Sequence, residues 1–217
     1  MGKINQGILG GFSGKVGTGV GSFWKGRATM RAMPGHVANP NTEPQRAARA
    51  RFRTLGIPIA RLTPFINETF NIGADAMRIT PDNLAMKSNY NVAITGSGTA
   101  VSIDWNRLQL SHGNGLLNVE GAAAVVGTGH SINISWTNNA GVDYLVLDND
   151  QVMCCVYNPR TEQASYDMVT ACRDDQSMVI HTPAAWAGDT VHVYLVARSE
   201  NKEHVSPSVH VGSVVCA

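Results

Sequence analysis

Charged side chains are scarce in this sequence. Lys, Arg, Asp and Glu make up 15% of its 217 residues, against about a quarter in ordinary soluble proteins. Hydrophobic residues reach 43%, and glycine occurs 22 times. Few charges combined with many apolar and short side chains indicate a β-rich protein that buries parts of its surface against neighbours.

Acidic residues are nearly missing from the start of the chain. Residues 1–65 contain ten basic residues and one acidic residue, Glu43, whereas residues 66–217 contain seven basic and fifteen acidic residues. This asymmetry has two functional interpretations: the basic end contacts nucleic acid, or it docks onto the acidic end of another copy. A third interpretation is that both sets of charges are merely solvated.

The motifs of common enzymes are also absent. Residues 14–15 read Gly-Lys, but residue 9 is not glycine and residue 16 is neither Ser nor Thr, so the phosphate-loop pattern fails. The seven histidines form no HExxH pair. Residues 148–150 read Asp-Asn-Asp without the glycine and glutamate of a calcium loop. We therefore predict a protein that is not an enzyme and has no catalytic residues, cofactor or metal.

Cysteine usage gives no metal or redox motif. The four cysteines are Cys154, Cys155, Cys172 and Cys216, and none lies in a CxxC pair. Neighbours in a strand point to opposite faces, so Cys154 and Cys155 should not share a partner. The expected state is reduced thiols in a protein made in the cytosol, with a bridge from Cys172 left open.

No apolar run approaches the length of about 18 residues that a membrane span needs. The opening MGKINQGILGGFSGKV is broken by glycines and Lys15, which does not fit a secretory signal. We expect a protein without a signal peptide or a membrane span.

Residues 1–36 are rich in glycine, with nine glycines in the first 26 positions. Glycine at this density costs backbone entropy and argues against independent folding. Apolar residues lie between the glycines, which is unusual for a flexible linker. We predict an extended arm that becomes ordered against a partner. Its candidate assembly residues are Ile8, Leu9, Phe12, Val16, Phe23 and Trp24.

Residues 37–89 are predicted to form a basic helical segment. Residues 42–45 read Thr-Glu-Pro-Gln, which is typical of a capped helix start. Gly56 and Pro58 are expected to break or kink this helix. Thr-Pro pairs at 63–64 and 80–81 predict short helices near 64–71 and 81–87.

Three arginines of this segment are the strongest chemical feature of the sequence. Arg46, Arg49 and Arg53 share one face at helical spacing, and Arg51 lies off it. Arginine binds phosphate or carboxylate through two parallel hydrogen bonds. Few aromatic residues lie between them, so base stacking is not expected. They are candidates to bind nucleic acid without sequence preference, or an acidic protein.

From about residue 90 the hydrophobic period changes to two. Residues 90–114 are predicted to be connecting strands, and residues 115–217 an antiparallel sandwich of the immunoglobulin or fibronectin type III kind. The fold class is therefore mainly β with a short helical part near 43–87. The expected strands are 93–95, 101–105, 108–111, 122–126, 131–136, 144–147, 152–157, 163–166, 178–181, 190–198 and 208–215.

Several motifs resemble an uncharacterised family associated with Bacteroidota, a domain of unknown function. They are MGKINQGILGGFSGKVG, Trp24-Lys25-Gly26, Asn39-Pro40 with Thr42, Gln45 and Arg51-Phe52, Trp136-Thr137-Asn138, Val156-Tyr157-Asn158-Pro159 and AGDTVHVYLVARSE from Ala187. The resemblance covers nearly the whole chain and implies no established activity.

A second resemblance concerns residues 39–52. Their sequence NPNTEPQRAARARF is similar to a motif that opens a helix in phage structural and head–tail proteins. It implies a virion component of a Bacteroidota phage, made in the host cytoplasm: a capsid, connector or tail part. Such a protein would assemble with its own copies and other virion proteins through its arm. A nucleic-acid-binding accessory protein and an adhesion module remain the alternatives.

Overall fold

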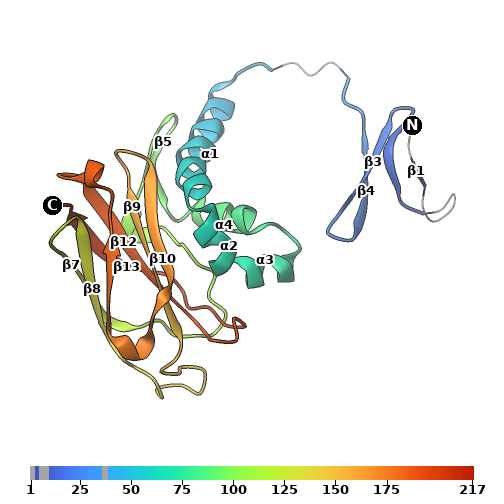
Figure 1. Ribbon diagram of the computed structural model, residues 1–217. Helices are drawn as coiled ribbons and strands as arrows, with labels where there is room; N and C mark the ends of the chain where they lie inside the picture. Colours follow the sequence, from blue (N-terminus) through green and yellow to red (C-terminus); the bar gives the residue numbers. More distant parts are fainter. Residues whose placement is uncertain (1–2, 5–9, 36–38) are drawn as a thin grey trace. The chain divides into compact units, whose positions relative to one another are not determined.

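The computed structural model describes residues 3–4, 10–35 and 39–217. Two compact units divide the chain, Met1–Thr42 and Glu43–Ala217 (Figure 1). The boundaries that the sequence suggested near residues 89 and 114 fall inside the second unit.

The first unit is an antiparallel sheet with the order β1-β2-β3-β4. Its strands are β1 Lys3–Ile4, β2 Phe12–Val16, β3 Gly19–Trp24 and β4 Arg27–Ala32. The expectation of one extended arm therefore needs correction for the described residues. Lys25 and Gly26, both with positive φ, form the two-residue turn between β3 and β4. Glycine here supplies the backbone conformation of a tight hairpin as well as an entropic cost.

The second unit opens with four helices. These are α1 Glu43–Arg61, α2 Thr63–Thr69, α3 Asn71–Met77 and α4 Pro81–Asn89. The Thr80 side chain caps α4 by accepting a hydrogen bond from Asn83 N. Thr63 does not cap α2, because its hydroxyl donates to the Ile59 carbonyl instead. The helix α3 was not predicted.

The helix α1 continues through Gly56 and Pro58, so these residues do not end it. Leu55 and Ile59, on either side of Pro58, are buried in the core together with Pro58 itself. Their packing compensates for the hydrogen bond that proline cannot donate.

Seven strands then form two sheets that pack as a sandwich. Three strands follow the order β11-β8-β7 and four follow β10-β9-β12-β13, with every pairing antiparallel. Their bounds are β7 Glu120–Val126, β8 Ser131–Thr137, β9 Gln151–Asn158, β10 Gln163–Cys172, β11 Ser177–His181, β12 Thr190–Arg198 and β13 Val209–Val215. The predicted sandwich is thus confirmed.

Two predicted strands are wrong. In residues 108–111, the Gln109 and Leu110 amides donate to the side chains of Asn89 and Ser208 instead of to a neighbouring strand. Residues 144–147 form turns in which the Asp143 side chain accepts from Leu145 N. Apolar alternation alone did not distinguish these side-chain-bonded segments from strands.

The helices cover the outer face of the four-stranded sheet (Figure 1). Cys154 of β9 faces the core between the two sheets, whereas adjacent Cys155 faces the helical layer. The connection from α4 to the sandwich contains the hairpin β5 Ile94–Ser97 and β6 Ala100–Ile103, followed by the short 3-10 helix η1 Trp105–Arg107. The helices, this connection and the sandwich therefore form one folded body.

Candidate functional site

The N-terminal sheet has one apolar face. Strand pairing aligns Phe23 with Ala28, Gly21 with Met30 and Val16 with Gly19. Phe12 lies two residues before Gly14, on the same face. Val16 is 53% exposed and Met30 74% exposed. The predicted assembly residues Phe12, Val16 and Phe23 thus share a surface.

Two glycines allow the aromatic rings to lie flat on this face. A Cβ atom on Gly21 would collide with the carbonyl oxygen and ring of Phe12. A Cβ atom on Gly11 would lie 2.7 Å from the Ala28 Cβ and collide with the Phe23 ring. The glycines of this segment are therefore contact surfaces for phenylalanine as well as turn formers.

The opposite face of the sheet is basic. It carries Trp24 opposite Arg27, Val20 opposite Arg31 and Lys15 opposite Val20. The hydroxyl groups of Ser22 and Thr29 are hydrogen-bonded at 2.7 Å on this face. Trp24, predicted together with the phenylalanines, therefore belongs to a different surface.

Sequence reasoning missed the basic residues of this face. A two-residue Lys-Gly turn flanked by alternating side chains is a hairpin signal, and it would have paired Trp24 with Arg27. Ile8 and Leu9, the other predicted assembly residues, lie outside the described residues.

The predicted arginine face lies on α1. Arg46, Arg49 and Arg53 are exposed. Arg51 instead donates to the Tyr90 carbonyl at 3.0 Å, and its guanidinium lies 5.0 Å from the centre of the Tyr90 ring. The structure therefore leaves the three predicted arginines on the surface and attaches Arg51 to the end of α4.

A histidine pair lies on the outer face of the four-stranded sheet. His192 Nδ1 of β12 and His210 Nε2 of β13 are 3.1 Å apart. The Trp105 ring of η1 stacks on His192 with 5.1 Å between ring centres. The Tyr194 hydroxyl donates to the Trp105 carbonyl at 2.8 Å. This cluster fastens the connecting segment to the sheet.

The pair of His192 and His210 should make the free energy of unfolding depend on pH. Burial and the neighbouring His210 lower the pKa of His192 to about 4, whereas an ordinary histidine titrates near 6.5. The unfolded chain therefore binds a proton that the folded chain excludes. Stability is complete above pH 6.5 and declines as the pH falls toward 4, by about 1–2 kcal/mol for this half-buried ring.

Urea unfolding between pH 4 and 8 measures this effect. The variant His192→Phe should show a flatter profile, while His181→Phe, a change at an exposed position, should leave the profile as in the wild type. Equal slopes for wild type and His192→Phe would contradict this role of His192.

Two motifs that are distant in sequence meet at one end of the sandwich. Asn158 donates to Asp189 at 2.7 Å, and Arg160 forms an ion pair with the same carboxylate. The hydrogen bonds from Arg160 and Asn158 hold the pKa of Asp189 below its usual range. These contacts join the β9–β10 turn to the start of β12. We therefore assign them a role in stabilising the fold.

Within the described ranges, no group of three or more His, Cys, Asp or Glu side chains is placed to hold a metal ion. The cysteines are free thiols, and burial raises the pKa of Cys155. None of the helices in the described part of the chain has the length and apolar character needed to cross a membrane.

The chain matches one protein family over most of its length. The match covers residues 11–212, and the family is described as a family of unknown function (DUF6266). No curated protein matches the chain. Among solved structures, it is similar to the fn3 domain of human collagen alpha-1(XX) chain at 17% identity and a TM-score of 0.35, over 49% of this chain and 92% of that one.

Proposed function

Because this chain belongs to the DUF6266 family, whose function is unknown, we propose its role from its own geometry. We propose a structural protein without catalytic activity that assembles in many copies through its N-terminal sheet. The specific assembly that we propose is a phage virion, in which the protein serves as a capsid, connector or tail part.

The observation that carries this proposal is a sheet without a core. Gly21 is the only buried residue among the described residues of the first unit. Phe23 and Trp24 are about half exposed, on opposite faces. The hydrophobic face of a sheet must be buried against another element to form a core, and large exposed apolar patches commonly mark interaction sites. A partner that covers the Phe12, Val16, Phe23 and Met30 face would supply the missing core.

The second unit supports a separation between a folded body and an attachment segment. Its sandwich core and its helical layer are both well buried, so Glu43–Ala217 has what it needs to fold without the sheet. In this proposal the second unit is the body of the subunit, and the N-terminal sheet is its attachment device.

The choice of a virion rests on the segment 39–52. The helix α1 begins at Glu43, inside the NPNTEPQRAARARF motif that resembles a helix opening of phage structural proteins. This resemblance supports a phage structural protein, and the resemblance of the whole chain to a family associated with Bacteroidota is the reason for proposing a phage of Bacteroidota.

Deleting residues 2–36 should abolish assembly and leave the second unit folded. Electron microscopy of the purified wild type should show rings, tubes or shells, and mass photometry of the deletion variant should show monomers. Thermal melting monitored by circular dichroism should show a cooperative transition in both. Assembly that survives the deletion would refute the proposal.

A triple variant tests the apolar face separately from the rest of the segment. Val16→Thr, Phe23→Ser and Met30→Gln together should prevent assembly. The matched control is Val125→Thr with Val179→Thr, two comparably exposed valines on the outer face of the three-stranded sheet. If both variants assemble alike, the apolar face is not the attachment surface.

The exposed arginines of α1 favour a second candidate, nucleic-acid binding without sequence preference. DNA affinity would then fall steeply with salt and would be lost in Arg46→Glu, Arg49→Glu, Arg53→Glu. The absence of a gel shift at about 50 mM salt would eliminate this candidate.

A further inference from the structure

We propose that the basic face of the N-terminal sheet docks onto an acidic loop end of the sandwich in a second copy of the chain. This inference rests on the proposed self-assembly and names the two surfaces that meet. The apolar face of the sheet remains available for its own cover.

The basic face combines positive charge with one large aromatic ring. Lys15 and Arg31 lie on either side of Val20, Arg27 lies opposite Trp24, and Trp24 is 54% exposed. The segment 1–42 contains five basic residues and no acidic one. Its partner should therefore be an acidic surface with an apolar centre.

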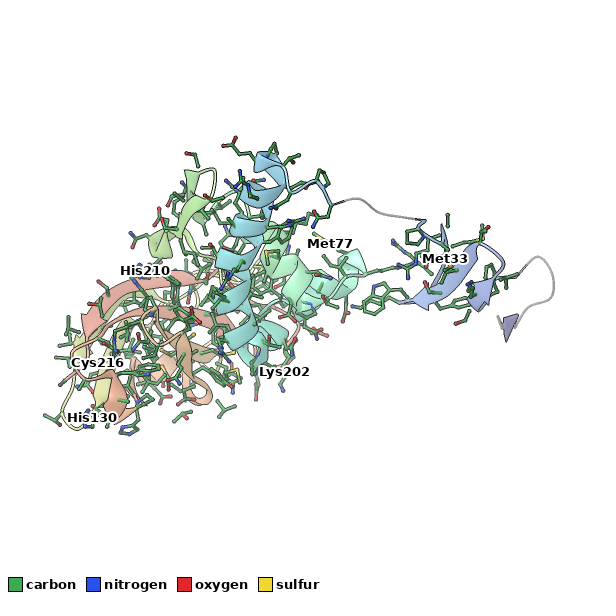
Figure 2. The ribbon with its side chains drawn as sticks, turned by 90° about the horizontal axis from the view of Figure 1, so that it is seen from above. Met33, Met77, His130, Lys202, His210 and Cys216 are labelled. Carbon is green, nitrogen blue, oxygen red and sulfur yellow. The ribbon has the colours of Figure 1, made fainter. Side chains whose placement is uncertain are left out.

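The loop end of the second unit has this composition. It is formed by residues 138–150, 172–176 and 199–204, and Lys202 lies at the end of the sandwich opposite to His130 and Cys216 (Figure 2). Six carboxylates are exposed there against this one lysine: Asp143, Asp148, Asp174, Asp175, Glu200 and Glu203.

Hydrogen bonds connect the loops of this end. Asn138 donates to Asp148 at 2.7 Å and to Asp174 at 3.3 Å. Asn149 is hydrogen-bonded to Glu200, which joins the first loop to the third. Arg173 does not neutralise the surface, because it is fully buried and paired with Asp150. The negative charge is therefore held in one place by the fold.

Apolar side chains lie beside carboxylates of the acidic loop end, with Asp143, Asp148 and Glu200 lining the same hollows. Tyr144 is 86% exposed, and Val142 and Leu147 are exposed beside it in the same loop. Tyr144 and Leu147 line both of two open hollows, of about 430 and 300 Å³. An exposed aromatic ring within acidic residues complements Trp24 within basic residues, and such aromatic anchors dominate the energy of many interfaces.

The proposed contact joins two different surfaces, so it is heterologous. Each copy then has one docking face and one receiving end, and a heterologous contact of this kind generates rings or open filaments when it continues from copy to copy. This geometry suits the many-copy assembly proposed above.

Two charge-reversed variants test the contact. The sheet variant carries Lys15→Glu, Arg27→Glu and Arg31→Glu, and the loop variant carries Asp174→Lys, Glu200→Lys and Glu203→Lys. Each variant alone should assemble about 100-fold more weakly than wild type, because like charges then face each other. An equimolar mixture should assemble again, since the opposite charges face each other in alternating copies.

The readout is mass photometry at low salt, with circular dichroism to verify folding. The matched controls are Lys87→Glu with Arg107→Glu for the sheet variant and Glu120→Lys with Glu162→Lys for the loop variant, all at exposed positions, and both should assemble as wild type. A mixture that remains monomeric, or a loop variant that assembles normally, would overturn the proposed contact.

The same experiment separates this inference from the proposed function. If wild type assembles and the deletion of residues 2–36 abolishes assembly, but charge reversal has no effect, only the docking contact is refuted. If wild type stays monomeric at every concentration, the proposed function and the docking contact both fail.

Discussion

A fragment of residues 115–217, the sandwich strands alone, should fail to fold, whereas residues 43–217 should fold cooperatively. The fragment lacks the helical layer that covers the outer face of the four-stranded sheet. Five side chains of that face lose their cover: Met153, Cys155, Tyr157, Tyr194 and Val196.

The expected size of this effect is comparable to the whole stability of a domain. Each of the five side chains is at most 1% exposed in the complete fold. Exposing a large apolar side chain costs about 1.5–3 kcal/mol, and an ordinary domain is stable by about 5–15 kcal/mol. The loss of the helical layer should therefore bring the sandwich to the edge of unfolding or beyond it.

Thermal melting followed by circular dichroism, and the binding of a dye that recognises exposed apolar surface, compare the folding of the two fragments. The 43–217 fragment should melt in one transition with little dye bound, and the 115–217 fragment should bind dye and show no cooperative transition. A sharp melt of the shorter fragment, at a temperature close to that of the longer one, would contradict the role of the helices.

The sequence contained a signal for this doubly covered sheet that period-two reasoning did not use. Residues 152–158 of β9 are all buried, and the segment VMCCVYN before Pro159 has hardly any polar side chains. Continuous apolar strands indicate burial on both faces. The alternating residues of β8 and β11 fit a sheet covered on one face. The sandwich strands were therefore predictable from their alternation. The helical layer on the four-stranded sheet was predictable only from the continuous apolar sequence of β9.

The candidate assembly surface was predictable only in part. The apolar character of Phe12, Val16 and Phe23 was evident, but their common face depends on strand pairing about the Lys25-Gly26 turn. The number of glycines suggested an arm without structure of its own, because glycine raises the entropic cost of folding. The sequence does not show that the Phe12 side chain packs on Gly21, which offsets part of that cost. Local composition does not contain that contact.

The acidic loop end shows a further limit of reading the sequence. Its carboxylates come from three loops separated by more than twenty residues each, and only the fold brings them together. The prediction that the basic and acidic parts of two copies could meet was available from charge alone. The positions of the two surfaces were not.

Arg173→Met should lower the free energy of unfolding by about 3–5 kcal/mol, the second large effect that we expect. Arg173 and Asp150 form an ion pair at 3.1 Å in which both side chains are fully buried. Arg173 also donates to the Leu117 carbonyl at 2.9 Å and to the Asn139 side chain. Burial lowers the pKa of Arg173, while Asp150 opposes this shift.

The cost comes from the group left behind. Without Arg173 the Asp150 carboxylate stays buried with an uncompensated charge, so Arg173→Met combined with Asp150→Asn should recover much of the loss. Arg160→Met is the matched control, because its ion pair with Asp189 has a 65% exposed arginine side chain, Asn158 still donates to Asp189 in its absence, and its loss should cost much less than that of Arg173. Urea unfolding measures all three variants. Equal losses for Arg173→Met and Arg160→Met would show that the buried pair does not hold the loop end together, and the fixed geometry on which the docking contact depends would need another cause.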